Sequence, residues 1–256
     1  MTQAIEALIP KDIKGEYRYN YNLAHLTWFK AGGDAAVFFK PEDLEDLAYF
    51  LKNCPKAVEI FVLGAGSNII IRNGGFKGVV VKLGRNFTNI SITENGELRV
   101  GAGALNFSLA QFCADSNISG FEFLVGIPGT IGGGIAMNAG SYGSEFKDII
   151  REVTFLDRNG GKHVISGTEC GFGYRHNSLS SDLIFVEAVF STSPGLKEEI
   201  KAKMADISAK RAASQPVKEK TGGSTFANPE GHRAWELIDK VGMRGSNIGD
   251  AQISPM

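Results

Sequence analysis

The feature that most constrains this chain is a glycine-rich segment, GIPGTIGGGIAMNAG, at residues 126–140. Six of its fifteen residues are glycine, and glycine loses more conformational freedom on folding than any other residue. Two interpretations account for this density. One is an ordinary flexible turn between strands. The other is a stretch of backbone without side chains, against which a large, flat, phosphorylated ligand can lie.

A second glycine signal is the turn GAGSN at residues 64–68, between two strand-like runs. It is not a Rossmann fingerprint, because Ile69 occupies the place of the third glycine and no helix follows to receive a pyrophosphate. The P-loop pattern GxxxxGK followed by Ser or Thr is also absent from the sequence. What remains is either a plain hairpin or a turn whose backbone N–H groups bind an anion, with Ser67 and Asn68 as further donors.

Taken together, the two segments favour a ligand that has both a pyrophosphate and a wide ring system, and FAD is the obvious candidate. Neither His nor Cys occurs in residues 61–73 or 126–140, so we expect the flavin to be bound non-covalently.

The composition of the whole chain excludes several classes of protein. Its 256 residues carry a formal net charge of −1, which gives no electrostatic reason to expect nucleic acid or an anionic membrane as a partner. The apolar runs have strand length, and the N-terminus lacks the regions of a signal peptide. The three cysteines, Cys54, Cys113 and Cys170, form no CxxC pair, which argues against a disulfide framework or a metal site. We therefore expect a cytoplasmic protein.

The spacing of apolar residues predicts an α+β fold. The N-terminal part reads as a βαβββ unit, with a helix over 42–54 and strands at 35–40, 58–64, 68–72 and 78–83. Asn95-Gly96 and Asn159-Gly160 predict two hairpins, and residues 105–116 predict a helix between them.

The composition changes at Pro194-Gly195, where a charged helix over 196–213 begins. Its spacing predicts that Ile200, Met204 and Ile207 face the core and that Glu199 and Lys203 pair on the surface. We place domain boundaries after residues 83 and 195, which divides the chain into 1–83, 84–195 and 196–256.

Four motifs in order, VLGAGSN, GFEFLVGIPGTIGGGIAMNAGSYG, FGYR and GGSTFANP, closely resemble those of the UDP-N-acetylenolpyruvoylglucosamine reductase family. The resemblance runs from about residue 26 to the last residue. It implies a flavoenzyme of peptidoglycan precursor synthesis, with FAD between two α+β subdomains (1–83 and 84–195) of the vanillyl-alcohol-oxidase (PCMH) type. The substrate-binding domain would be 196–256. It also implies NADPH as co-substrate, a UDP-sugar enolpyruvyl ether as substrate, and a monomer.

The resemblance assigns roles to individual residues. Arg175 in FGYR would stabilise the carboxylate and the developing enolate, and Ser224 in GGSTFANP would donate the proton. Tyr174 and Asn228 would contact the substrate. Without the motifs, Arg175 would be a surface ion-pair partner and Ser224 a turn residue. The FAD-binding residues would be Gly64, Ala65, Gly66, Ser67, Asn68, Gly126, Ile127, Pro128, Gly129, Gly132, Gly133, Met137, Asn138 and Gly140.

Two departures qualify the match. Only 49 positions separate Arg175 from Ser224, which resembles the shorter subclass without an inserted tyrosine-bearing loop. The sequence also stops at Met256, before the segment that supplies the family's catalytic glutamate, so we expect a truncated, poorly active chain. Segment 215–220 is a candidate for holding the UDP phosphates. A different oxidoreductase of the same FAD-binding group and a non-catalytic nucleotide-binding protein remain as alternatives.

Overall fold

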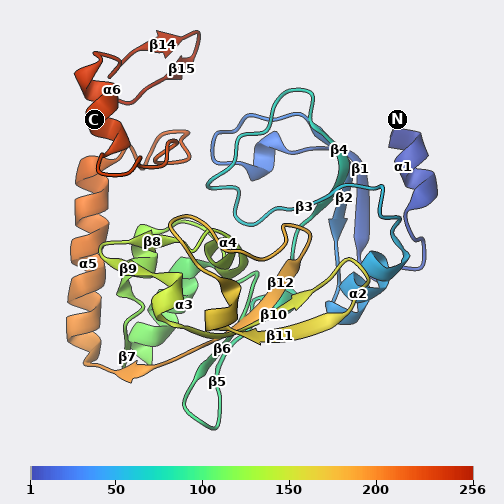
Figure 1. The fold of residues 1–256 in the computed structure, drawn as a ribbon, viewed down its shortest axis with the longest axis horizontal. Coiled ribbons are helices and arrows are strands. Elements are labelled where there is room, and N and C mark those ends of the chain that lie inside the picture. Colours follow the sequence, from blue (N-terminus) through green and yellow to red (C-terminus); the bar gives the residue numbers. More distant parts are fainter. Residues whose placement is uncertain (1, 256) are drawn as a thin grey trace.

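Two β-sheets, one of four strands and one of five, form the frame of the protein (Figure 1). The computed structural model describes residues 2–255, with the backbone alone for residues 2–4. Helices and strands both contribute, which confirms the expected α+β class. Within the described part of the chain, none of the helices combines the length and the apolar character that a membrane span requires.

The first sheet has the strand order β1-β2-β4-β3. Its strands are β1 (Glu16–Asn22), β2 (Asp34–Lys40), β3 (Ile60–Val62) and β4 (Phe76–Val81). β1 and β2 are antiparallel, whereas β4 is parallel to both β2 and β3. Helix α1 (Thr2–Leu8) precedes this sheet, and helix α2 (Leu44–Asn53) follows β2. Asp43 caps α2 by accepting a hydrogen bond from the Asp46 N–H, and the helix buries Leu47, Phe50 and Leu51 against the sheet.

The expected strand at 68–72 is wrong. β3 and β4 are parallel neighbours, so the chain must return from the end of one to the start of the other, and residues 63–75 form that return. Ile69 and Ile71 pack on the cluster that contains Leu63 and Val80 instead of joining the ladder. Their β-branched side chains therefore cover the sheet rather than extend it.

The second sheet is antiparallel throughout, with the order β11-β10-β12-β6-β5. Its strands are β5 (Ile90–Ile92), β6 (Leu98–Gly101), β10 (Ile150–Leu156), β11 (Lys162–Ser166) and β12 (Ile184–Phe190). Both predicted hairpins are confirmed, and Gly96 and Gly160 adopt positive φ angles of 78° and 75° in their turns. The predicted helix over 105–116 is confirmed as α3 (Asn106–Asp115).

Shorter elements connect these parts. The helical ones are η1 (Ala24–Leu26), η2 (Arg85–Phe87), η3 (Glu122–Gly126), α4 (Ile131–Ala136), η4 (Phe146–Asp148), η5 (Gly167–Cys170) and α6 (Ala234–Lys240). The strand pairs are β7 (Ile118–Ser119) with β13 (Ser193–Pro194), β8 (Gly140–Ser141) with β9 (Ser144–Glu145), and β14 (Asn247–Ile248) with β15 (Ala251–Gln252). The glycine-rich segment is thus partly helical, because α4 lies within it.

Helix α5 (Lys197–Ser214) confirms the predicted amphipathic helix, and its Ile200, Met204 and Ile207 are buried. The long orange helix stands on the side of the second sheet that is remote from the first sheet, and leads to the C-terminal segment (Figure 1). The expected surface pair of Glu199 with Lys203 is not the contact that forms. The Lys203 ammonium lies 3.5 Å from the buried Glu122 carboxylate, which fastens α5 to η3.

Gly134→Ala should lower the free energy of unfolding by about 1–3 kcal/mol, because overpacking a rigid core has this cost. A Cβ at Gly134 would lie 2.2 Å from Cζ of Phe146, which is fully buried and cannot move aside. Gly133→Ala is the matched control in the same helix, since its Cβ would meet only the Thr130 hydroxyl, at 3.4 Å. Denaturant unfolding of both variants measures the difference, and equal stability would contradict the packing argument.

Candidate active site

A cleft of about 870 Å³ opens between the two sheets. Its walls come from β3 and the turn after it, from the residues that directly follow β4 and β6, from Leu105 before α3, from α4, and from residues 175–185. Leu156, Ile184 and Val186 of the second sheet pack into the core of the first, so the two sheets are fixed relative to one another on either side of this cleft. A volume of this size is typical of pockets for small molecules and cofactors.

The turn 64–68 is held in place by close backbone contacts. Gly66 has a φ of 67°, and a Cβ there would lie 1.9 Å from the Leu26 carbonyl oxygen, so only glycine fits. The Gly66 carbonyl accepts a hydrogen bond from the Trp28 N–H at 2.9 Å. The Ser67 hydroxyl donates to the Pro128 carbonyl at 2.6 Å, which joins the turn directly to the glycine-rich segment.

The glycine-rich segment is positioned by Asn106 and Thr130. The Asn106 side chain donates to the Ile127 carbonyl at 3.0 Å, and its backbone N–H donates to the Gly129 carbonyl at 3.0 Å. The Thr130 hydroxyl caps α4 by accepting from the Gly133 N–H at 3.3 Å. These bonds fix the backbone between Ile127 and Gly133, where Thr130 and Gly133 line the cleft.

The expected FAD-binding residues fall into two groups. Those that line the cleft are Gly64, Ala65, Gly132, Gly133 and Met137. Those outside the lining are Gly66, Ser67, Asn68, Gly126, Ile127, Pro128, Gly129, Asn138 and Gly140. Asn138, in the second group, has a supporting role. It is fully buried, and its side chain donates to Glu145 and to the Gly173 carbonyl at 3.1 and 2.9 Å, which anchors the loop that carries Tyr174 and Arg175.

Arg175 lies where the main cleft meets a smaller cavity of about 390 Å³, and it lines both. Its backbone has a φ of 56°, in the sharp turn closed by the bridge of Gly173 to His176. The guanidinium donates to the Gly140 carbonyl at 3.0 Å and lies 5.3 Å from the centre of the Tyr174 ring. Within residues 2–255 no carboxylate forms an ion pair with it, so its charge is available to a ligand.

Glu145 of β9 carries a carboxylate near Arg175, and its surroundings favour the charged form. A hydrogen bond from Lys147 lowers the pKa of Glu145 below its ordinary value, and the hydrogen bond from Asn138 and the charge of Arg175 act in the same direction. Glu145 and Lys147 form an ion pair at 2.8 Å, so the carboxylate is already neutralised without Arg175.

The segment that carries Ser224 and Asn228 folds back onto these elements. A Cβ built on Gly222 would lie 2.8 Å from the Phe29 ring and 3.4 Å from the Ser67 carbonyl oxygen, which places this segment beside the turn 64–68. Farther along, the Asn228 N–H donates to the Tyr174 hydroxyl at 3.3 Å.

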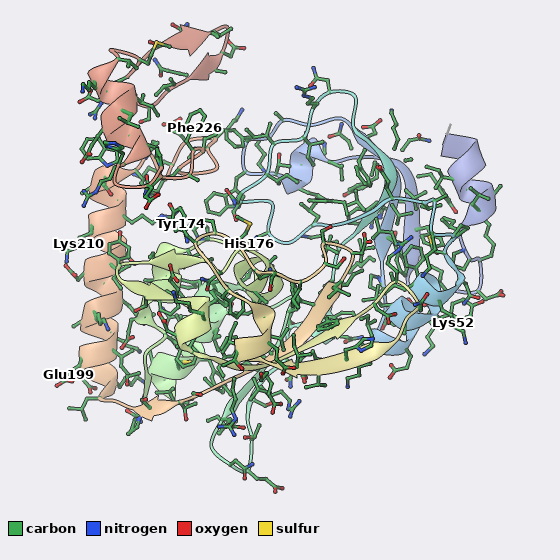
Figure 2. The ribbon with its side chains drawn as sticks, viewed as in Figure 1. Lys52, Tyr174, His176, Glu199, Lys210 and Phe226 are labelled. Carbon is green, nitrogen blue, oxygen red and sulfur yellow. The ribbon has the colours of Figure 1, made fainter. Side chains whose placement is uncertain are left out.

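Ser224 is exposed and lies between these two contacts. Figure 2 shows Tyr174 and His176 on the loop near α4, and Phe226 on the C-terminal loop beyond Tyr174. The fold therefore brings the motifs FGYR and GGSTFANP to the same end of the molecule. The Asn228 side chain accepts from the Ala234 N–H at 3.0 Å, so part of its bonding capacity holds the start of α6.

Among the cleft residues that the sequence did not predict, Thr130 and Lys82 lie beside Gly64. Thr130 lies between glycines in the motif and lines the cleft at Gly64. Lys82 directly follows the buried run Val79–Val81 and donates to the Gly64 carbonyl at 2.6 Å. A charged residue at the end of a buried strand is the signal that could have identified it. The described part of the chain holds no cluster of His, Cys, Asp and Glu suited to a metal ion.

Comparison with known proteins assigns both parts of the chain. Residues 35–166 match the model of an FAD binding domain, and residues 215–256 match that of the C-terminal domain of UDP-N-acetylenolpyruvoylglucosamine reductase. The UDP-N-acetylenolpyruvoylglucosamine reductase of Rickettsia bellii strain RML369-C is 59% identical over 244 residues, which is 95% of this chain and 81% of that protein.

Solved structures agree with the sequence relatives. The UDP-N-acetylenolpyruvylglucosamine reductase of Thermus caldophilus superposes with a TM-score of 0.82 at 33% identity, covering 94% of this chain and 85% of that one. A cholesterol oxidase of Brevibacterium sterolicum shares the fold alone, with a TM-score of 0.53 at 13% identity over 73% of this chain and 40% of its own. The glycine-lined cleft, the two matched domains and the 59% identity lead to one conclusion: the chain belongs to the UDP-N-acetylenolpyruvoylglucosamine reductase family.

Proposed function

We propose that this protein reduces UDP-N-acetylglucosamine enolpyruvate to UDP-N-acetylmuramate with electrons from NADPH, as an FAD-containing oxidoreductase of peptidoglycan precursor synthesis. The observation that carries the proposal is the cleft itself. Its wall is formed by two glycine segments joined by the Ser67–Pro128 hydrogen bond, Arg175 lies at its edge, and the Ser224 segment folds back onto the turn 64–68.

The residues present fit FAD. The lining glycines leave room that side chains would fill: Gly133 faces the cleft, and a Cβ there would meet only the Thr130 hydroxyl, at 3.4 Å. We assign the dinucleotide to Gly64, Ala65, Gly132, Gly133 and Met137, within an FAD-binding unit of residues 1–195 made of subdomains 1–83 and 84–195. The remaining glycine-segment residues would support this wall. When bound, FAD accepts electrons from NADPH and supplies a hydride to the methylene carbon of the enolpyruvyl group.

We assign to Arg175 the binding of the substrate's negative charge. A carboxylate conjugated to the reacting double bond gains enolate character during reduction, and a fixed cation at that position is the largest usual catalytic contribution. The hydrogen bond to the Gly140 carbonyl occupies one donor of the guanidinium, and the remaining donors of its planar fork can bind a carboxylate.

We assign Ser224 as the donor of the proton that completes the reaction. Its hydroxyl makes no hydrogen bond within residues 2–255, so the O–H is available to a substrate carbon. Tyr174 and Asn228, which contact each other at 3.3 Å, would border the sugar nucleotide in the substrate-binding domain 196–256.

Two measurements on the purified protein test the function. The absorbance spectrum should show tightly held flavin, and NADPH oxidation should require the enolpyruvyl sugar nucleotide. If the protein retains flavin but consumes NADPH equally with and without this substrate, it catalyses a different FAD-dependent reaction. A colourless protein that cannot be reconstituted with FAD would overturn the proposal as a whole.

Arg175→Lys should slow reoxidation of the reduced flavin by the enolpyruvyl substrate by about 10- to 100-fold, because lysine keeps the charge and loses the multi-donor fork. Reduction of the flavin by NADPH should change much less, since it does not involve the substrate carboxylate. Rapid mixing with absorbance detection separates the two half-reactions. An equal loss in both would indicate that Arg175 mainly supports the loop through its bond to Gly140.

A further inference from the structure

Lys82 is a lysine inside the cleft whose positive charge no carboxylate neutralises. Its side chain is half-buried, it lines the cleft, and it forms no ion pair with any residue in the described part of the chain. Burial lowers the pKa of Lys82, and the nearby charge of Lys40 lowers it further. Desolvation of a cation without a counter-ion is costly, and such a lysine normally has a partner.

The position of Lys82 follows from the sheet. β3 and β4 are parallel, with Val62 opposite Val81, so the residues that come next leave the sheet at the same edge. The Leu63 N–H bonds to the Val81 carbonyl, and the Lys82 N–H bonds to the Phe39 carbonyl, each at 2.8–2.9 Å, which fixes the backbone on both sides. Ligands of parallel sheets bind at this edge, beyond the carboxyl ends of the strands.

The Lys82 ammonium is tied to the first residue of the turn 64–68. It donates one hydrogen bond to the Gly64 carbonyl at 2.6 Å, and an ammonium has three donors. Gly64 also lies against the Thr130 hydroxyl, so three elements meet there: the turn, the end of β4 and the glycine-rich segment. A fixed cation with two further donors, beside the backbone of Gly64 and Ala65 in the cleft lining, is a site for a phosphate anion.

We infer that the Lys82 ammonium binds the diphosphate of FAD, as the charged complement of the turn 64–68. This rests on the proposed function, because it takes FAD as the occupant of the cleft. The bond to Gly64 holds the ammonium in position, and the diphosphate supplies the counter-ion that the protein lacks at this point. Binding of the cofactor then removes the electrostatic cost of the half-buried lysine.

FAD affinity of the apoprotein, measured by the change of flavin fluorescence, tests this role. Lys82→Gln keeps a donor for the Gly64 carbonyl and loses the charge, and Lys82→Met loses both. Each should bind FAD about 30-fold more weakly, the loss expected for a hydrogen bond to a charged group. Lys82→Arg should restore affinity to within a few-fold of the parent. Lys40→Gln is the control, because it removes the neighbouring charge outside the cleft lining and should leave affinity unchanged.

Competition by ADP shows which part of FAD the lysine contacts. ADP carries the diphosphate without the flavin ring, so it should lose affinity for Lys82→Gln in parallel with FAD. Parental FAD affinity in Lys82→Gln would show that the lysine is only a tether for Gly64 and would overturn the inference. A loss confined to FAD, with ADP unaffected, would place the lysine at the flavin end and overturn it as well. In both cases the parent still binds FAD, whereas a parent without FAD affinity would refute the proposed function itself.

Discussion

Ser224→Ala is expected to retain FAD, to accept electrons from NADPH at the parental rate, and to be reoxidised by the enolpyruvyl substrate about 10²–10⁴-fold more slowly, as for a lost general acid. The serine hydroxyl is the group that would protonate the substrate carbon after hydride transfer. Its segment approaches the turn 64–68 at Gly222, two residues before the serine, so removing the hydroxyl should not disturb the flavin site. Rapid mixing with absorbance detection follows each half-reaction separately.

Ser224→Cys is the matched variant, because it keeps an ionisable proton at nearly the same position. It should recover part of the lost reoxidation rate, while Thr225→Ala, next to it in the chain, should change neither half-reaction by more than a few-fold. If Ser224→Ala is reoxidised at the parental rate, the serine is a turn residue and the proton comes from another group.

Gly133→Leu is expected to abolish flavin retention while the protein stays folded. A Cβ at Gly133 meets only the Thr130 hydroxyl, at 3.4 Å, so the protein itself tolerates a side chain there. The residue lines the cleft, and the leucine side chain would occupy the surface assigned to FAD. The flavin-to-protein absorbance ratio of the purified variant and its thermal unfolding without added FAD give the two readouts.

Two other glycines provide the comparison. Gly74→Leu should keep full flavin content, because a Cβ at that position has no neighbour within 4 Å and the residue lies outside the cleft. Gly66→Leu should also lose flavin, but for a different reason: it would distort the backbone of the turn 64–68. A Cβ at Gly66 would lie 1.9 Å from the Leu26 carbonyl oxygen, and the residue has a φ of 67°. Normal flavin content in both Gly66→Leu and Gly133→Leu would refute the assignment of the glycine segments to the cofactor.

The local elements of the fold could be predicted because their signals are local. The turns at Gly96 and Gly160 require positive φ angles that glycine adopts freely, and both hairpins form as predicted. The spacing of Ile200, Met204 and Ile207 predicted the buried face of α5 for the same reason. The first strand, β1, gives a weaker pattern: its seven residues have only two half-buried positions and no fully buried one, and it was not predicted.

The candidate site was predictable only in part. The motifs identified the two glycine segments and Arg175, and these do line or support one cleft. They could not distinguish glycines that face the cleft, such as Gly133, from those that pack against protein, such as Gly134. Both positions read as glycine in one helix, and the difference is the Phe146 ring, which belongs to a later element of the chain.

The sequence by itself determined the family, the class of cofactor and the positions of the hairpins and amphipathic helices, because each depends on residue types within a short window. Only the tertiary structure decided that residues 68–72 cover the sheet, since this follows from the parallel pairing of β3 with β4. It also placed Lys82 at Gly64 and Gly222 against Phe29. Such contacts join segments distant in the chain, and their geometry is fixed by packing and strand order, which no local pattern records.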